Sequence, residues 1–282
     1  MLICPIVLAA GWLAATFVCT NDPVAARLEA SAGRMPRCLS RFAEYPPNPL
    51  RLTALGGLLG SAFPPNPDFW LKDVDFTCVS PWNDSSGCQC AGTAISRRHV
   101  IFAKHFPLRP GTRMAFVGET GETSHYTVKA TKALKDCDIA VGLLDYELTP
   151  DVHPAKVLPD GFEKWLINGS KLPVVTFNQR EQTVLTQLLC VTNAESGKPI
   201  VMNRKGMSAL WKKFNVPMVG GDSGNPAFLL WGGRPILLYC LQSGGAGLGP
   251  WIHERRGEVQ GIMDDLCPGY RLETFDFKGE MP

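Results

Sequence analysis

From Phe69 onward, the sequence consists of short apolar runs separated by Gly, Pro, Asn and Asp. Such runs, bounded by turn-forming residues, are typical of β-strands, and their regular spacing predicts an all-β sandwich or barrel. At 282 residues the chain is long enough for one large β domain or two small ones. The runs that we expect to be strands are 100–103, 114–117, 139–144, 174–177, 183–192, 227–230 and 236–241.

Apolar residues near the C-terminus follow a helical spacing instead, which predicts a helix after the last strand. These residues are Ile252, Val259, Ile262, Met263 and Leu266.

The first residues have the character of a targeting segment. Residues 2–18 are almost wholly apolar and uncharged, and polar residues follow at once. We expect residues 1–19 to be a signal peptide, so that the protein is secreted or lies in the periplasm or cell envelope. Because no Lys or Arg precedes the run and no small-x-small cleavage site follows it, an N-terminal membrane anchor is the alternative. The membrane is an expected partner only if this segment is retained.

Residues 20–68 are expected to be a linker or pro-segment. Proline-rich pieces at 46–49 and 64–67 bracket a stretch of Gly and Leu, and such sequences favour extended, loosely held backbone.

The 10 cysteines also fit an exported protein. Cys4 and Cys19 lie in the expected signal segment, and the even number that remains is consistent with disulfide bonds in an oxidising compartment. Zinc or any other metal is not expected, because Cys88 and Cys90 lack the usual two-residue gap and no second ligand pair accompanies them and Cys137.

Residues 220–226, with the sequence GGDSGNP, suit neither a helix nor a strand. The glycines around Ser223 favour a tight loop that presents one hydroxyl. Because glycine has no Cβ, backbone N–H groups beside the serine can turn inward together and stabilise an oxyanion. A serine alcohol is a weak nucleophile, so a histidine base and an orienting carboxylate are also required.

The G-D-S-G-x-P string resembles the nucleophile loop of the chymotrypsin-like (trypsin-like) serine peptidases, with Ser223 as the nucleophile. That family has its catalytic residues in the order His, Asp, Ser. Residues 92–105 resemble the family's G-x-L-I-x-x-x-x-V-L-T-A-x-H pattern, which places His105 in the catalytic position. His99, in the polar turn of the same segment, is expected to be solvated.

The run Asp-Ile-Ala-Val that begins at Asp138 matches the D-I-A-L run that opens with the family's catalytic acid. An acid at the start of an apolar strand is shielded from water, where it can hold the imidazole in one tautomer. Asp136 is the alternative, but its next residue, Cys137, begins no such run.

The resemblance implies an all-β, two-barrel chymotrypsin-like fold with a C-terminal helix over residues 69–282. The first barrel would span about 69–161, and the second barrel with the helix about 162–282. The triad would assemble in the cleft between the two barrels.

The resemblance also implies a serine endopeptidase that hydrolyses peptide bonds through an acyl-enzyme, without a cofactor. The backbone N–H groups of Gly221 and Ser223 would form the oxyanion hole. The alternative is a peptidase-fold module that has lost catalysis and serves in binding or structure.

The expected partner is a polypeptide substrate. Family members that cut after Lys or Arg carry an aspartate six residues before the nucleophile, and here that residue is Pro217, followed by Met218. A cation would therefore enter the pocket without a paired charge, so we expect cleavage after apolar or small uncharged residues. Ser243, Gly244 and Gly245 resemble the strand edge that pairs with the substrate backbone.

Nucleic acid is not an expected partner, because the net charge is only +2 and no dense basic patch is present. Nothing in the chain resembles the junction at which animal digestive members of the family are cut and activated. Asp222 should therefore find a partner within the fold, and the sequence does not identify it.

Overall fold

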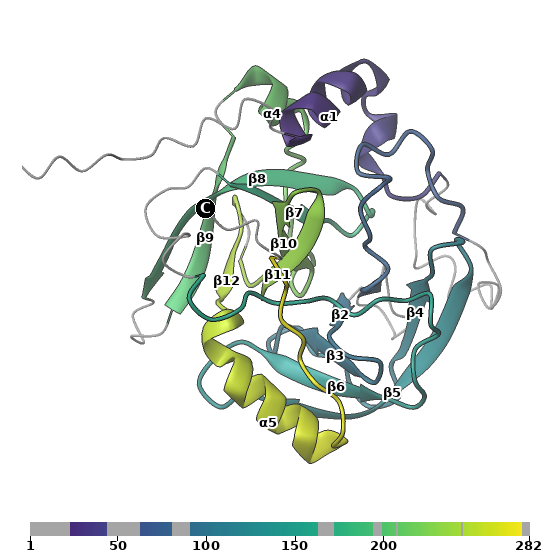
Figure 1. Cartoon of the computed structure of the whole chain (residues 1–282), viewed down its shortest axis with the longest axis vertical. Coiled ribbons are helices and arrows are strands. Elements are labelled where there is room, and N and C mark those ends of the chain that lie inside the picture. The colour runs from purple at the N-terminus through teal and green to yellow at the C-terminus, as the bar shows by residue number, and fades with distance from the viewer. Residues whose placement is uncertain are drawn as a thin grey trace, which may run out of the picture.

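A computed structural model describes residues 23–43, 63–80, 91–162, 172–193, 199–206, 208–243 and 245–277. Within them the chain is mostly β, with two barrel-like sheets and a helix near the C-terminus (Figure 1). The expected targeting segment, residues 1–19, lies outside the described residues. No helix in the described part is long and apolar enough to cross a membrane.

The first sheet comes from the N-terminal half of the described chain. Its neighbours are all antiparallel, and its two edge strands also contact each other, which curls the sheet toward closure. In spatial order its strands are β1 (Val79–Ser80), β2 (Gly92–Ala94), β3 (His99–Phe102), β6 (Ala140–Leu144), β5 (Thr123–Ala133) and β4 (Arg113–Val117).

The second sheet comes from the C-terminal half and is also antiparallel throughout, again with contact between its edge strands. In spatial order its strands are β11 (Arg234–Cys240), β10 (Pro226–Trp231), β7 (Pro173–Phe177), β8 (Thr183–Asn193), β9 (Pro199–Lys205) and β12 (Leu248–Pro250).

The strands expected from apolar runs are confirmed, with ends that differ by a residue or two. The structure adds strands that the apolar pattern did not indicate. In β5 only Tyr126 and Val128 are buried, so one face of this long strand is largely solvated and its sequence carries no continuous apolar run.

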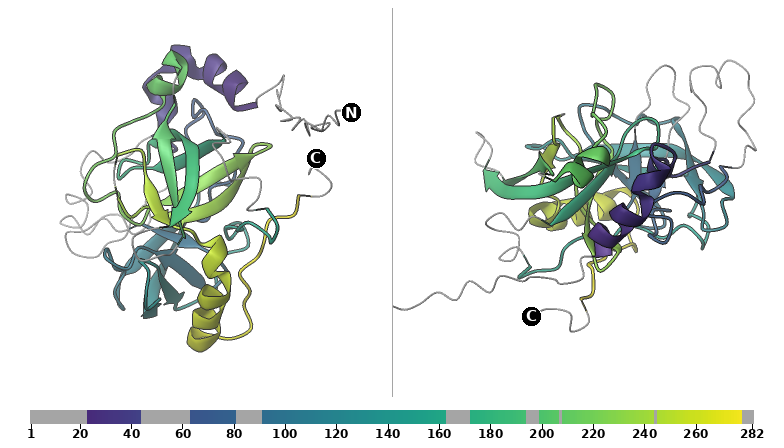
Figure 2. Two further views of the ribbon diagram at one scale, coloured as in Figure 1. Left: turned by 90° about the vertical axis from the view of Figure 1, so that its left-hand side faces the viewer. Right: turned by 90° about the horizontal axis from the view of Figure 1, so that it is seen from above.

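Helices from each end of the chain cover the sheets. Helix α5 (Arg256–Leu266) confirms the helix expected near the C-terminus, and it buries Val259, Ile262 and Met263. Although α5 follows the second sheet, it packs against β5 and β6 of the first (Figure 2). Near the other end, α1 (Pro23–Ser31) packs beside α4 (Ala209–Lys213), which precedes the loop that carries Ser223 (Figure 1). The short 3-10 helices are η1 (Ala32–Arg34), η2 (Arg37–Leu39) and η3 (His253–Arg255).

Residues 23–43, which we call the N-terminal arm, belong to the folded body. Val24, Leu28 and Leu39 lie in the main hydrophobic core, and Phe42 is buried against Phe63. Residues 23–43 of the expected linker or pro-segment therefore pack on the rest of the protein, because their apolar side chains have found partners. The Gly/Leu stretch lies outside the described residues, and a pro-segment role stays a prediction.

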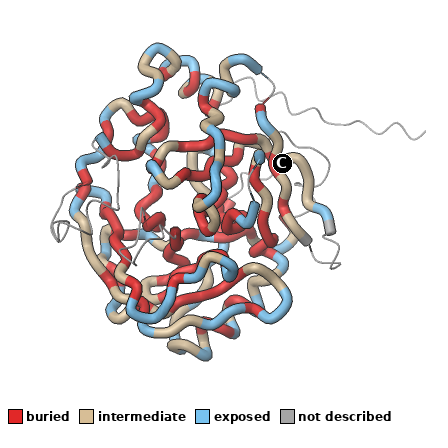
Figure 3. The backbone as a smooth tube through the Cα atoms, turned by 180° about the vertical axis from the view of Figure 1, so that it is seen from behind, coloured by how far each residue is buried: buried red, intermediate tan, exposed pale blue. Residues whose placement is uncertain are grey.

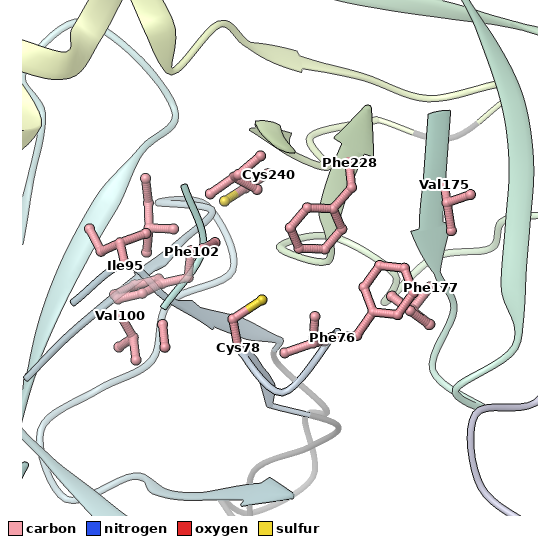
Figure 4. Close-up of a cluster of buried hydrophobic side chains, with 14 of the residues drawn as sticks. Phe76, Cys78, Ile95, Val100, Phe102, Val175, Phe177, Phe228 and Cys240 are labelled. Atoms are coloured by element: carbon pink, nitrogen blue, oxygen red, sulfur yellow. The ribbon is translucent and has the colours of Figure 1, made fainter. Parts of the chain in front are cut away.

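The two sheets meet across a shared core. Phe76, which precedes β1, contacts Phe177 of β7 and Phe228 of β10 with ring centroids 5.0 and 5.6 Å apart. In Figure 4 these rings lie on one side of Cys78 and Cys240, and Ile95 and Phe102 lie on the other, within the same hydrophobic cluster. Buried residues run through both sheets, and exposed residues gather in turns and on helix surfaces (Figure 3). One hydrophobic core is therefore shared by the two sheets, and a second cluster, which includes Val174, Leu229 and Leu238, lies within the C-terminal half.

His99 is not solvated, contrary to expectation. It belongs to β3 and is fully buried, with Nδ1 2.8 Å from the Ser96 hydroxyl and the ring edge against Tyr270. Burial lowers the pKa of His99 to about 4, so it lies in the core as a neutral side chain.

Several cysteines lie in the fold as thiols. Cys38, Cys78 and Cys240 are buried, and burial raises the pKa of each. Cys190 and Cys267 are free and partly exposed. These five form no disulfide in the structure, while Cys88 and Cys90 lie outside the described residues.

Candidate active site

Strand pairing brings His105 and Asp138 together. Strand β3 runs antiparallel to β6 with Phe102 opposite Ala140, so the residues just after β3 lie beside those just before β6. The Lys104 N–H donates to the Asp138 carbonyl at 3.4 Å, which continues the ladder past the strand ends. The spacing of the two motifs therefore has a direct structural cause.

Asp138 holds His105 through both carboxylate oxygens. Oδ1 accepts the His105 backbone N–H at 2.7 Å, and Oδ2 lies 2.5 Å from the imidazole Nδ1. The Asp138 side chain is only 12% exposed, against 45% for His105. A carboxylate at Nδ1 favours the tautomer with its proton there, which leaves a lone pair on Nε2.

The second sheet supplies the third residue. Ser223 lies just before β10, and its Oγ is 2.9 Å from His105 Nε2. The three residues expected from the sequence are thus within hydrogen-bonding reach in the order that general-base activation of a hydroxyl requires. Among the described residues, Asp138 rather than Asp136 is the carboxylate at His105.

Gly224 wedges the serine loop between the sheets. Its φ is +87°, and a Cβ there would lie 3.0 Å from the Ala91 carbonyl oxygen and 3.6 Å from the Ala103 nitrogen. On the other side its N–H donates to the Leu241 carbonyl at 2.8 Å. Only glycine fits both this backbone conformation and this close approach, which explains the residue after the serine.

Two backbone N–H groups beside the hydroxyl are available. Neither the Gly221 N–H nor the Ser223 N–H donates to any other group of the described residues. Gly221 has a φ of +98°, a conformation that a side chain would disfavour. These two groups are the expected oxyanion donors, and the loop leaves both of them for a ligand.

Asp222 has a partner that the sequence did not reveal. It is almost fully buried, and its carboxylate accepts the Val219 N–H at 2.7 Å and the Gln179 N–H at 3.0 Å. Burial raises the pKa of Asp222, while the two backbone donors oppose that rise. No local pattern could have indicated Gln179, because it lies 43 residues from Asp222 in the chain.

The expected substrate-binding residues form two neighbouring segments. Pro217 and Ser243 are exposed, as is Gly245, while Gly244 lies outside the described residues. Met218 links the segments, since its Cε is 3.3 Å from where a Cβ on Gly247 would stand. Absence of a side chain at Gly247 therefore lets the two walls approach.

One group among the described residues has the donor set for a metal ion. Asp75, Glu119 and His153 offer ligand atoms that all lie within 4.8 Å of one another, and all three are exposed. The Asp75 carboxylate already hydrogen-bonds the His153 Nδ1 at 2.8 Å, so these two side chains are partners of each other without a metal ion. Of the three cysteines that were candidates for zinc, Cys88 and Cys90 lie outside the described residues, and Cys137 is partly buried against the main core.

Comparisons with known proteins give no further guide. No family model matches the chain, and a search of curated proteins finds no significant match. The case for function therefore depends on the geometry of the site.

Proposed function

We propose that the chain is a serine endopeptidase with a two-barrel, chymotrypsin-like fold. The observation that carries the proposal is the chain of contacts from Asp138 through His105 to Ser223, at 2.5 and 2.9 Å. The motif resemblance supports the same reading independently of the distances. Placement supports it as well, because His105 and Asp138 come from the first sheet and Ser223 from the second.

In the proposed reaction, Ser223 Oγ attacks the carbonyl carbon of the scissile peptide while its proton passes to His105 Nε2. The carbonyl oxygen becomes an oxyanion, which the N–H groups of Gly221 and Ser223 stabilise. Asp138 holds the ring and stabilises the imidazolium. The proton then passes to the leaving amine as the C–N bond breaks, which leaves an ester between Ser223 and the substrate.

Hydrolysis of that ester repeats the steps with water as the nucleophile. His105 takes a proton from water, the hydroxide attacks the acyl carbon, and the returned proton restores the Ser223 hydroxyl. No step requires a group beyond the three side chains and the two backbone donors. The proposed environment is secretory or periplasmic, following the expected signal segment.

The test is labelling of the full chain with a fluorophosphonate probe. Wild type should take the label, and Ser223→Ala and His105→Ala should lose it, because a serine without its base is not activated. Ser124→Ala, on β5, and His153→Ala are matched controls and should label as wild type does. A folded wild type that takes no label would refute the proposal and favour the non-catalytic binding module.

A further inference from the structure

The loop that carries Ser223 is attached to a turn that lies outside the triad. This turn, residues 178–182, connects β7 with β8, and we call it the β7–β8 turn. Its Gln179 makes two contacts with the loop: the backbone N–H donates to Asp222 Oδ1 at 3.0 Å, and Nε2 donates to the Gly220 carbonyl at 2.9 Å. Uncharged donors, from Gln179 and Val219, therefore hold the Asp222 carboxylate.

The side-chain bond of Gln179 also fixes a peptide plane. In a trans peptide the C=O and the following N–H point in opposite directions. The Gly220 carbonyl faces Gln179, so the Gly221 N–H faces away from it, with no partner among the described residues. The fit is close, because a Cβ on Gly221 would lie 2.3 Å from Gln179 Nε2. Rotation of this peptide would move one of the two expected oxyanion donors.

The β7–β8 turn is itself held in an unusual shape. Glu181 has a φ of +56°, a left-handed conformation that residues other than glycine seldom adopt. The Asn178 Oδ1 accepts the N–H groups of Arg180 and Gln182, which closes the turn from within. A non-glycine residue persists in this conformation only where its surroundings enforce it.

The N-terminal arm supplies those surroundings. The Arg41 N–H donates to the Glu181 carbonyl at 3.1 Å, and the Arg41 Nε lies 3.5 Å from Glu181 Oε2 in a pair that is almost fully buried. The Arg41 guanidinium lies 4.5 Å from the Phe42 ring centroid and 5.6 Å from that of Phe177. It also donates to the Phe76 and Val79 carbonyls, which anchors the arm to the first half of the chain.

We propose that Gln179 is a positioning residue for the oxyanion hole, and that the N-terminal arm sets its position through Arg41 and Glu181. This inference rests on the proposed function. It assigns to uncharged donors of the β7–β8 turn the task of orienting the loop around Asp222, and it makes the arm part of the catalytic unit.

The test compares Gln179→Met with Gln182→Met in the full chain. Methionine matches glutamine in length but donates no hydrogen bond. Both residues lie on the β7–β8 turn, and Gln182 bonds Asn178 rather than the serine loop. The readouts are the maximal rate of fluorophosphonate labelling, the pH profile of that rate, the half-saturating probe concentration and the melting temperature.

Gln179→Met should lower the maximal labelling rate about 10- to 100-fold, somewhat less than the roughly 100- to 1000-fold loss when a donor is removed outright. The half-saturating concentration and the pH profile should stay as in wild type, because the probe contacts and the His105–Asp138 pair are unchanged. Gln182→Met should label within about twofold of wild type. A merely structural role would lower the melting temperature of both variants without this selective loss of rate.

Arg41→Lys tests the arm. It keeps the charge but loses the forked donors, and it should slow labelling in the same direction. Combined with Gln179→Met, its effect should be much smaller than the product of the two, because both act on one peptide. If Arg41→Lys does not fold, Gln179→Met decides the positioning role, and Glu181→Gln combined with Gln179→Met decides the link to the arm.

The outcomes separate the two proposals. Labelling of Gln179→Met at the wild-type rate would overturn the positioning role and leave the serine hydrolase proposal intact. If the double variant lost labelling rate by the full product of the two single-variant losses, the link to the arm would be overturned. A wild type that takes no label would overturn the proposed function, and the positioning role with it.

Discussion

Replacing Glu181 with glutamine should remove a loss of stability that the protein suffers as the pH rises. Glu181 is only 1% exposed, and burial raises the pKa of its carboxyl from 4.5 to about 7, although the nearby Arg41 opposes the rise. In the unfolded chain the carboxyl is in water and titrates at its ordinary value. Folded and unfolded states therefore bind different numbers of protons between these two pH values.

The direction follows from which state holds the proton. Between pH 4.5 and about 7 the folded protein keeps Glu181 protonated while the unfolded chain has released that proton, so a rise in pH favours unfolding. Below this window Glu181 is protonated in both states and contributes no pH dependence. Above it the loss of stability is complete. At 1.36 kcal/mol for each pH unit, the loss comes to roughly 3 kcal/mol.

Urea denaturation of wild type and Glu181→Gln at intervals from pH 4 to 8.5 measures this effect. The free energy of unfolding of wild type, relative to the variant, should fall by roughly 3 kcal/mol across the window, while other titrating groups cancel in the difference. Any constant offset, including the effect of leaving Arg41 beside a neutral amide, also cancels from the slope. Glu29→Gln, at an exposed position on α1, is the control. Parallel curves for wild type and Glu181→Gln would refute the reasoning.

Three further predictions concern the site and the arm. Asp138→Asn should lower kcat by about four orders of magnitude by favouring the wrong imidazole tautomer, and Asp136→Asn should lower kcat far less. The reverse ranking would show that Asp136 rather than Asp138 is the acid that orients His105. A peptide-library digest should show cleavage after apolar or small uncharged residues, since Met218 and Gly247 bring uncharged walls together; dominant cleavage after Lys or Arg would overturn that pocket. Leu28→Ala should lower the free energy of unfolding by about 2–5 kcal/mol in urea denaturation, because this side chain is fully buried; a change below 0.5 kcal/mol would place the arm outside the cooperative fold.

Much of the triad geometry could be predicted because each residue stands beside a local signal. His105 and Asp138 flank the paired strands β3 and β6, whose apolar runs are visible in the sequence. Ser223 lies between Gly221 and Gly224, two glycines that positive φ values and close contacts require. In these places a short-range pattern and the three-dimensional requirement coincide.

Other features depend on contacts that leave no local pattern. Residues before Phe69 contain prolines that suggested loose backbone, yet Arg41 and Phe42 are buried by partners far along the chain. His99 was misplaced because its strand begins one residue earlier than its apolar run. Gln179 has no distinguishing neighbours, and its role becomes visible only when the β7–β8 turn meets the loop around Asp222.

These long-range contacts bear on when the candidate site can form. The His105–Asp138 pair needs only β3 and β6, which lie in one sheet. The Ser223 loop needs more, since Gly224 contacts Ala91 of the first half and Leu241 of the second, while Asp222 needs the β7–β8 turn. That turn is held in a left-handed conformation at Glu181 beside an arm that enters from the N-terminus. Ser223 is thus in place only once both sheets and the arm have packed, so the same contacts that complete the core also complete the candidate site.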